Sequence, residues 1–98
     1  MKQITARELD SALKEGKMFN IIDVREAAEV ATGKIPGAIN IPLGLLEFRM
    51  NELNKGEDYF IVCQSGGRSA MATQFLEQFG FNVTNMTGGM MAWTGEIE

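Results

Sequence analysis

Histidine is absent from this chain of 98 residues, and cysteine occurs once, at Cys63. The absence of histidine excludes Cys–His and Ser–His–Asp catalysis, and it excludes metal sites built on imidazole ligands. A single cysteine rules out multi-cysteine zinc and iron–sulfur centres, and no cluster of carboxylates stands at ligand spacing. We therefore expect neither a metal ion nor any other bound cofactor.

Long apolar runs and clusters of positive charge are lacking as well. No stretch of 18 or more apolar residues occurs, and the N-terminus has no signal-peptide core, so we predict no membrane association and a cytoplasmic location. A lone unpaired thiol also fits a reducing compartment. The nine Lys and Arg residues are scattered and the net charge is −4, which argues against nucleic acid as a partner.

The length predicts one globular domain over residues 1–98. Short apolar segments rich in β-branched residues alternate with helical patterns along it. We expect strands at residues 2–4, 19–24, 39–41, 59–62 and 82–86, and helical segments at residues 5–15, 26–30, 42–53, 69–80 and 90–93. Such alternation predicts an α/β fold with three layers, α/β/α, in which helices cover both faces of a parallel sheet.

Several details of these elements follow from local chemistry. Thr5 and Glu8 have the spacing of a capping box, and Pro42 suits the first position of a helix. We expect the acidic tail, residues 96–98, to be frayed. We expect core and rim packing for Trp93 with Met86, Met90 and Met91, and the alternative is that exposed methionines help to dock an acceptor protein. Core packing rather than an interface is also expected for a second apolar group: Leu43, Leu45, Leu46 and Phe48.

The stretch of residues 60–69 combines a buried-strand pattern, Cys63 and the start of a helix. It therefore places the thiol at the carboxyl end of a strand, which is where ligands bind in open α/β sheets. The plain alternative is that Cys63 is a small buried apolar residue, as many lone cysteines are. The two glycines that follow, Gly66 and Gly67, disfavour a helix start and so favour a functional loop.

Three features of this loop are expected to lower the pKa of Cys63. The helix N-terminus favours an anion, and the Gly66–Gly67 pair lets successive backbone N–H groups turn inward. Arg68 adds a permanent positive charge. Because the thiolate is the nucleophile, such a loop supports attack on an electrophile with a good leaving group without a separate general base.

These residues resemble the rhodanese (thiosulfate sulfurtransferase) family. The family's active-site loop, Cys-x-x-Gly-x-Arg-Ser, is similar to Cys63-Gln64-Ser65-Gly66-Gly67-Arg68-Ser69. Three further signatures resemble segments of this chain in the same order: residues 22–26 with Glu29, residues 33–42, and Gly88-Gly89 with Trp93. Together the four matches span nearly the whole chain.

The resemblance implies a fold and a reaction. The fold has five parallel strands in the order 3-2-4-5-1. Cys63 takes a sulfane sulfur from thiosulfate or a persulfide, holds it as a Cys63 persulfide, and passes it to a thiophilic acceptor such as cyanide or a thiol. The loop from Gln64 to Gly67 cradles the sulfur, Arg68 orients the anionic donor, and Ser69 caps the helix.

The resemblance also bears on residues outside the loop. Asp23 and Arg25 are interpreted as structural support that binds neighbouring loop backbone and pairs with Glu26 or Glu29. Gln64 departs from the pattern, because many thiosulfate-using members have Arg or Lys there. We therefore expect thiosulfate to be a poor donor and a persulfide to be the natural one. Lys34 replaces a frequent histidine, which a surface loop tolerates.

Two other functions share this fold. Cdc25-type phosphatases have five residues between cysteine and arginine, whereas four stand between Cys63 and Arg68 here, so the shorter loop favours sulfur over phosphate. Phosphatase or arsenate reductase activity is therefore the alternative enzyme function. The other alternative is a binding module without catalysis, although such relatives usually lose the cysteine. For partners we expect a small-molecule sulfur donor and acceptor, with a donor or acceptor protein as a further partner, and we expect a monomer.

Overall fold

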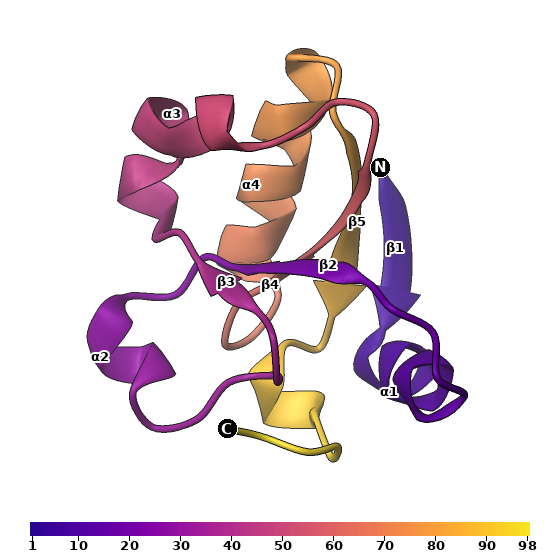
Figure 1. The fold of residues 1–98 in the computed structure, drawn as a ribbon. Coiled ribbons are helices and arrows are strands. Elements are labelled where there is room, and N and C mark those ends of the chain that lie inside the picture. Colours follow the sequence, from indigo (N-terminus) through magenta and orange to yellow (C-terminus); the bar gives the residue numbers. More distant parts are fainter.

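The computed structural model describes residues 1–98, and its centre is a sheet of five parallel strands (Figure 1). Their order is β1-β5-β4-β2-β3, which is the predicted order 3-2-4-5-1 read from the other edge. The prediction of fold class is therefore confirmed. The strands are β1 (Lys2–Thr5), β2 (Asn20–Asp23), β3 (Ile39–Asn40), β4 (Asp58–Val62) and β5 (Asn82–Thr87).

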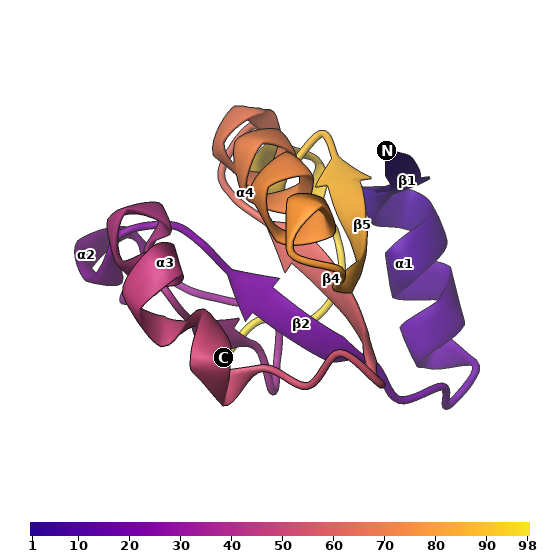
Figure 2. The same cartoon turned by 90° about the horizontal axis from the view of Figure 1, so that it is seen from above.

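Helices lie on both faces of the sheet, as the alternating pattern predicted (Figure 2). One face packs against α1 (Ala6–Lys14), and the other packs against α3 (Leu46–Arg49) and α4 (Gly67–Gln78). The remaining helical elements are short: α2 (Ala27–Val30), η1 (Leu43–Leu45), η2 (Met50–Glu52) and η3 (Met90–Ala92).

The central strand β4 shows why this sequence forms a buried parallel sheet. Its side chains alternate between faces, so Tyr59, Ile61 and then Cys63 join the core beneath α3 and α4. Val62 points to the other face and joins the core beneath α1. Because both faces of this strand are buried, its side chains can be apolar at every position. A strand with one face in solvent would instead alternate apolar and polar side chains.

The first helix begins as its sequence predicted. The backbone N–H of Glu8 donates to the Thr5 hydroxyl at 3.0 Å, and the Thr5 N–H donates to the Glu8 carboxylate at 2.9 Å. Both halves of the capping box are therefore present. Gly16 follows the C-cap residue with a φ of +87°, a conformation that glycine adopts without strain.

The region predicted as one helix over residues 42–53 is instead three short pieces, η1, α3 and η2. Pro42 is the N-cap of η1 rather than the first helical residue. The expectation of core packing is wrong for Leu45, which is 47% exposed, and for Phe48, which is 87% exposed. Leu46 alone of this helical turn is buried, because a four-residue helix brings a single side chain to the sheet. In the C-terminal apolar group Met86 is buried, whereas Met91 is 72% exposed and packs in no core.

The C-terminal segment also differs from its prediction. The expected helix over 90–93 is one 3₁₀ turn that ends at Ala92. The tail, predicted to fray, is bound to the segment before β3: Glu98 and Lys34 exchange two backbone hydrogen bonds, at 2.9 and 3.2 Å. The Glu98 carboxylate also accepts from Lys34 Nζ and from the backbone of Gly37. None of the helices is long and apolar enough to cross a bilayer.

Candidate active site

Cys63 lies directly after β4, at the carboxyl edge of the sheet. The adjacent strand β2 ends beside it, because Asp23 pairs with Val62 in the sheet register. The Cys63 side chain is fully buried within the core on the α4 side. The structure therefore places the thiol at the edge where ligands bind in parallel sheets, as its position in the sequence predicted.

Helix α4 begins at Gly67, two residues earlier than predicted, so Ser69 is its third residue and not its cap. Gly66 is the N-cap, with a φ of +104°. This left-handed conformation turns the Gly66 N–H toward the thiol, where it donates to Sγ at 3.0 Å. The buried Ser69 hydroxyl lies 3.3 Å from Sγ and 3.1 Å from the carbonyl oxygen of Gly66.

These contacts set the acidity of the thiol. Burial raises the pKa of Cys63, but hydrogen bonds from the Ser69 hydroxyl and from the backbone N–H groups of Ser69, Gly66 and Ser65 outweigh it. The pKa of Cys63 therefore lies below the ordinary value of a cysteine. A sulfur that is easily ionised and held by several donors is a nucleophile that is also a good leaving group.

Arg68 is paired with a carboxylate, which the loop pattern did not predict. Its guanidinium forms a fork with the two carboxylate oxygens of Glu29, at 2.6 and 2.8 Å. This ion pair lowers the pKa of Glu29 to about 2 and raises the pKa of Arg68. The strongest influences on the pKa of Cys63 are thus burial and hydrogen bonds, while Arg68 ties the loop to the segment after β2.

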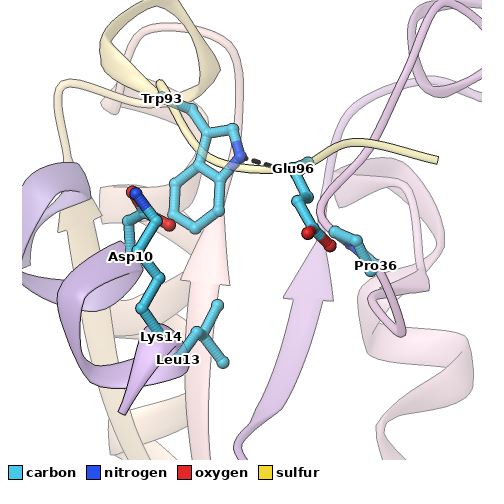
Figure 3. A pocket seen from close by; sticks show the side chains of 6 residues that line it. All are labelled: Asp10, Leu13, Lys14, Pro36, Trp93 and Glu96. Carbon is cyan, nitrogen blue, oxygen red and sulfur yellow. Dashed lines mark hydrogen bonds and ion pairs between the residues drawn. The ribbon is translucent and has the colours of Figure 1, made fainter. Parts of the chain in front are cut away.

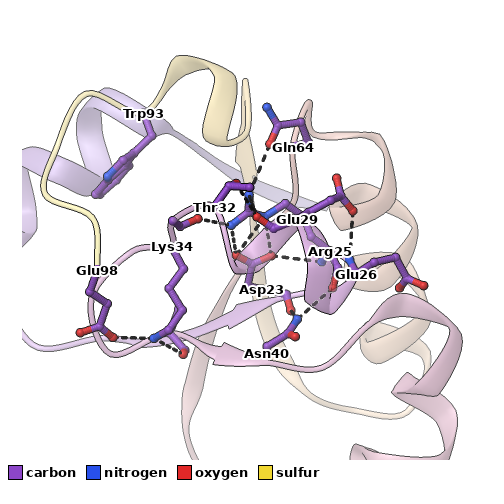
Figure 4. A network of polar contacts seen from close by, with 12 residues as sticks. Asp23, Arg25, Glu26, Glu29, Thr32, Lys34, Asn40, Gln64, Trp93 and Glu98 are labelled. Carbon is purple, nitrogen blue, oxygen red and sulfur yellow. Dashed lines mark hydrogen bonds and ion pairs between the residues drawn. The ribbon is translucent and has the colours of Figure 1, made fainter.

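Asp23 and Arg25 form a buried pair with each other, at 2.8 Å, rather than with the carboxylates of Glu26 or Glu29 (Figure 4). Arg25 also donates to the backbone carbonyl of Gly33 at 2.8 Å, which agrees with a role in binding loop backbone. A further contact joins Arg25 to the side-chain oxygen of Gln64 at 3.4 Å. The pair therefore links three segments that meet at the carboxyl edge.

The residues predicted for the site do come together around Cys63. Ser65 and Gly67 are exposed, Gln64, Gly66 and Arg68 are half-buried, and Ser69 is buried, while Asp23 and Arg25 support the loop from beside β4. Their parts in catalysis stay predictions. Sequence reasoning missed Glu29 as the partner of Arg68, since an ion pair between residues 39 positions apart leaves no local pattern.

Sequence reasoning also missed that the segment after β5 binds the backbone of the loop. The backbone N–H groups of Met90 and Met91 donate to the carbonyl oxygens of Cys63 and Gln64, at 2.8 and 3.0 Å. Gly89 makes this approach possible, because a Cβ there would lie within 3 Å of both carbonyl groups. The Gly88-Gly89 pair in the sequence was the available signal, since a glycine pair often marks a close backbone approach.

The two hollows in the surface are separate from the loop. One cavity of about 220 Å³ lies between α1 and the segment around Pro36, with Trp93 and Glu96 at its rim (Figure 3). Within it Lys14 pairs with Asp10 at 3.0 Å, and the Trp93 indole donates to the backbone of Glu96. A second cavity lies between η1, α3 and α4. Neither cavity is lined by Cys63.

Comparison with known proteins agrees with this geometry. The family model described as rhodanese-like domain matches residues 5–96. A putative sulfurtransferase of Bacillus subtilis, YtwF, is 40% identical over 98 residues, which cover all of this chain and 95% of that protein. The putative sulfur carrier protein YrkF of the same organism is 40% identical over 97 residues, 98% of this chain, but the chain spans only 52% of its length.

A solved structure shows the same fold. A rhodanese-like domain protein from Staphylococcus aureus matches with a TM-score of 0.94 and 44% identity, over 100% of this chain and 97% of that chain. The parallel sheet, the loop after β4 and these similarities define one class of protein. The chain belongs to the family of rhodanese-like domains.

Proposed function

We propose that this protein is a sulfurtransferase that carries sulfur as a persulfide on Cys63. The observation that supports this most directly is the pair of hydrogen-bonding groups at Sγ: the Gly66 N–H donates to it at 3.0 Å, and the Ser69 hydroxyl lies 3.3 Å from it. They lower the pKa of a thiol that has no histidine to take its proton. The similarity to proteins named sulfurtransferases points to the same reaction.

The first step transfers sulfur to the enzyme. The Cys63 thiolate attacks the outer sulfur of a donor, the bond between that sulfur and the rest of the donor breaks, and a new S–S bond forms on Cys63. Thiosulfate would leave as sulfite, and a persulfide would leave as a thiolate. Because the Cys63 side chain is fully covered, the loop of residues 64–67 must open slightly to admit the donor.

The second step discharges the enzyme. A thiophilic acceptor such as cyanide or a thiolate attacks the outer sulfur of the persulfide, and Cys63 leaves as a thiolate. The hydrogen bonds that favour ionised Cys63 also favour its departure, so the same donors assist both steps. No acid is needed for a leaving group of this kind, which suits a site without histidine.

A persulfide is the better candidate for the donor than thiosulfate. Gln64 brings no positive charge to the mouth of the loop, and the positive charges of Arg25 and Arg68 are bound to Asp23 and Glu29. A dianion such as thiosulfate therefore meets little net attraction at this site. We propose that a low-molecular-weight or protein-bound persulfide supplies the sulfur.

The phosphatase alternative has less support from this geometry. Phosphoryl transfer needs donors for three equatorial oxygens, whereas both outer nitrogens of Arg68 are occupied by Glu29. The binding-module alternative does not explain an ionisable Cys63 held by converging donors. Hydrolysis of an aryl phosphate that depends on Cys63 would favour the phosphatase reading instead.

The test is to incubate the protein with thiosulfate and with a glutathione persulfide and to measure its intact mass. Sulfur transfer predicts a gain of about 32 mass units, one sulfur atom, on the wild type and none on Cys63→Ser. Subsequent addition of cyanide should remove the added mass. A wild type that gains no mass from either donor would contradict the proposed function.

A further inference from the structure

A second feature of the molecule is an apolar groove between α4 and the segment of η1 and α3. Its volume is about 220 Å³. Figures 1 and 2 show η1 and α3 standing opposite α4 on one side of the sheet. The groove, called here the α3–α4 groove, is lined by Leu43, Gly44, Leu46, Glu47, Met71 and Phe75, of which four are apolar side chains.

The elements that form the groove carry exposed apolar side chains, of which Met71 lines the groove itself. Phe48 is 87% exposed, Met71 is 61% exposed and Leu45 is 47% exposed, and all three lie on the elements that form the groove. Single exposed apolar residues are ordinary on a protein surface, whereas a group of them around a hollow marks an interaction site. An exposed methionine adds an adaptable contact.

This groove is joined to the active-site loop by α4 itself. The helix begins at Gly67, directly after the residue whose N–H binds Cys63 Sγ. Met71 lies three residues after Arg68, so the two side chains share one side of the helix. A partner seated in the groove therefore lies next to the loop that opens onto Cys63.

The charges around the groove select its partner. The two cations on these elements are already bound, Arg49 to Glu52 and Arg68 to Glu29. The carboxylate of Glu47 lines the groove and forms no ion pair, so the unpaired charge in the groove is negative. A second copy of this chain would bring like charges together, whereas a partner with Lys or Arg around an apolar side chain would be complementary.

We propose that the α3–α4 groove is the docking surface for a sulfur-carrying protein, which inserts an apolar side chain with basic neighbours and presents its persulfide to Cys63. This inference rests on the proposed function. In the transfer the partner's terminal S–S bond breaks, the partner leaves as a thiolate, and a new S–S bond forms on Cys63. One thiolate and one persulfide are consumed and one of each is produced, so no external oxidant or reductant is needed.

The probe for this proposal is a synthetic amphipathic helical peptide with a Leu and Met face, Lys residues beside that face, and one cysteine converted to a persulfide. A matched peptide has Glu in place of each Lys. The rate of Cys63 persulfide formation is followed by mass. We expect the basic peptide to react at least ~10-fold faster than the acidic one at low salt, a ratio that corresponds to ~1.4 kcal/mol of binding.

Two variants test whether the faster reaction of the basic peptide depends on the groove. Met71→Glu should remove most of the advantage of the basic peptide, while Met18→Glu, at a 95% exposed methionine outside the groove, should not. The rate with glutathione persulfide should be the same in both variants and the wild type. In a spectrum of ¹⁵N-labelled protein, the basic peptide should shift amide signals in residues 43–48 and 68–75.

The docking proposal would be overturned by equal rates for the basic and acidic peptides, or by peptide-induced shifts outside the groove, for example around Trp93. Equal losses in Met71→Glu and Met18→Glu would do so as well. Failure of the proposed function looks different, because the wild type would then gain no sulfur from glutathione persulfide either. The two failures are therefore distinguishable in one set of measurements.

Discussion

Arg68 donates from both outer guanidinium nitrogens to the two carboxylate oxygens of Glu29, at 2.6 and 2.8 Å. The pairing joins the first turn of α4 to the end of α2, across 39 residues of sequence. It holds the loop of residues 63–69 against its neighbour and neutralises the one cation that the loop contains. Substitution of Glu29 tests the second consequence, the neutralisation of Arg68.

Glu29→Gln should improve the use of thiosulfate. The substitution removes the charge that neutralises Arg68, so the site gains one net positive charge beside Cys63. We expect KM for thiosulfate to fall about fivefold at low salt and the gain to shrink as salt is added. Steady-state kinetics with cyanide as acceptor measure this, with Glu47→Gln as a control at a carboxylate that binds no cation. An unchanged KM in Glu29→Gln would show that Arg68 does not meet the donor.

Gln64→Arg should act in the same direction by a different route. Arg25 lies 3.4 Å from the Gln64 side-chain oxygen, so a cation at position 64 is repelled from Arg25 toward the mouth of the loop. There it attracts the thiosulfate dianion, and we expect KM for thiosulfate to fall about five- to tenfold. Kinetics with glutathione persulfide serve as the comparison, since a less charged donor gains less. Thiosulfate kinetics equal to the wild type would count against the role given to Gln64.

Ser69→Ala should raise the pKa of Cys63, because the hydroxyl 3.3 Å from Sγ is lost and burial remains. The wild-type pKa of Cys63 is lowered by these donors, so the thiolate forms as pH rises through a midpoint below the ordinary value of a cysteine. The rate of alkylation by iodoacetamide should follow the same curve, displaced to higher pH in Ser69→Ala. Ser69→Thr keeps the hydroxyl and should restore the wild-type profile.

The same experiment has a clear negative outcome. If the alkylation profiles of the wild type and Ser69→Ala coincide, the hydroxyl does not stabilise the thiolate.

The lowered pKa of Cys63 also determines how the unfolding free energy changes with pH. Because the folded pKa of Cys63 is depressed, its contribution is present above the pKa of the unfolded chain and is lost as pH falls through the folded pKa.

Gly89→Ala should disrupt the brace behind the loop. Its φ is +60°, and a Cβ would lie within 3 Å of the carbonyl groups of Cys63 and Gln64. We expect a loss of about 3 kcal/mol in unfolding free energy, from backbone strain and overpacking together. Gly16→Ala is the matched control, because its φ is +87° but nothing lies within 4 Å. Denaturant titration should give about 1 kcal/mol there; equal losses at the two positions would mean that the close contact carries no cost.

Much of the fold was predictable because it depends on local patterns. The capping box at Thr5 and the buried run of β4 involve neighbours in sequence, so they are visible without a structure. The strand order came from the resemblance of four motifs to a known family. The loop residues were predictable from local sequence, because Cys63 and the groups that bind its sulfur lie within seven consecutive positions.

What the sequence did not show depends on distant contacts. Glu26 and Glu29 were expected to pair with Arg25, whereas the fold brings the Glu29 carboxylate to Arg68, which is 39 positions away. Leu45 and Phe48 are apolar and were expected in the core, yet Leu45 precedes α3 in η1 and Phe48 lies on the side of α3 opposite the buried Leu46. Glu98 is bound rather than frayed because it pairs with Lys34. The two residues are 64 positions apart, so no local pattern in the sequence indicates this contact.

The central claim is that Cys63 carries sulfur, and intact-mass analysis tests it most directly. The wild type and Cys63→Ser are incubated with thiosulfate and with glutathione persulfide, and each is then treated with cyanide. The account predicts a gain of about 32 mass units on the wild type alone, larger in yield with the persulfide and reversed by cyanide. A wild type whose mass is unchanged by both donors, or a Cys63→Ser variant that gains the same mass, would contradict it.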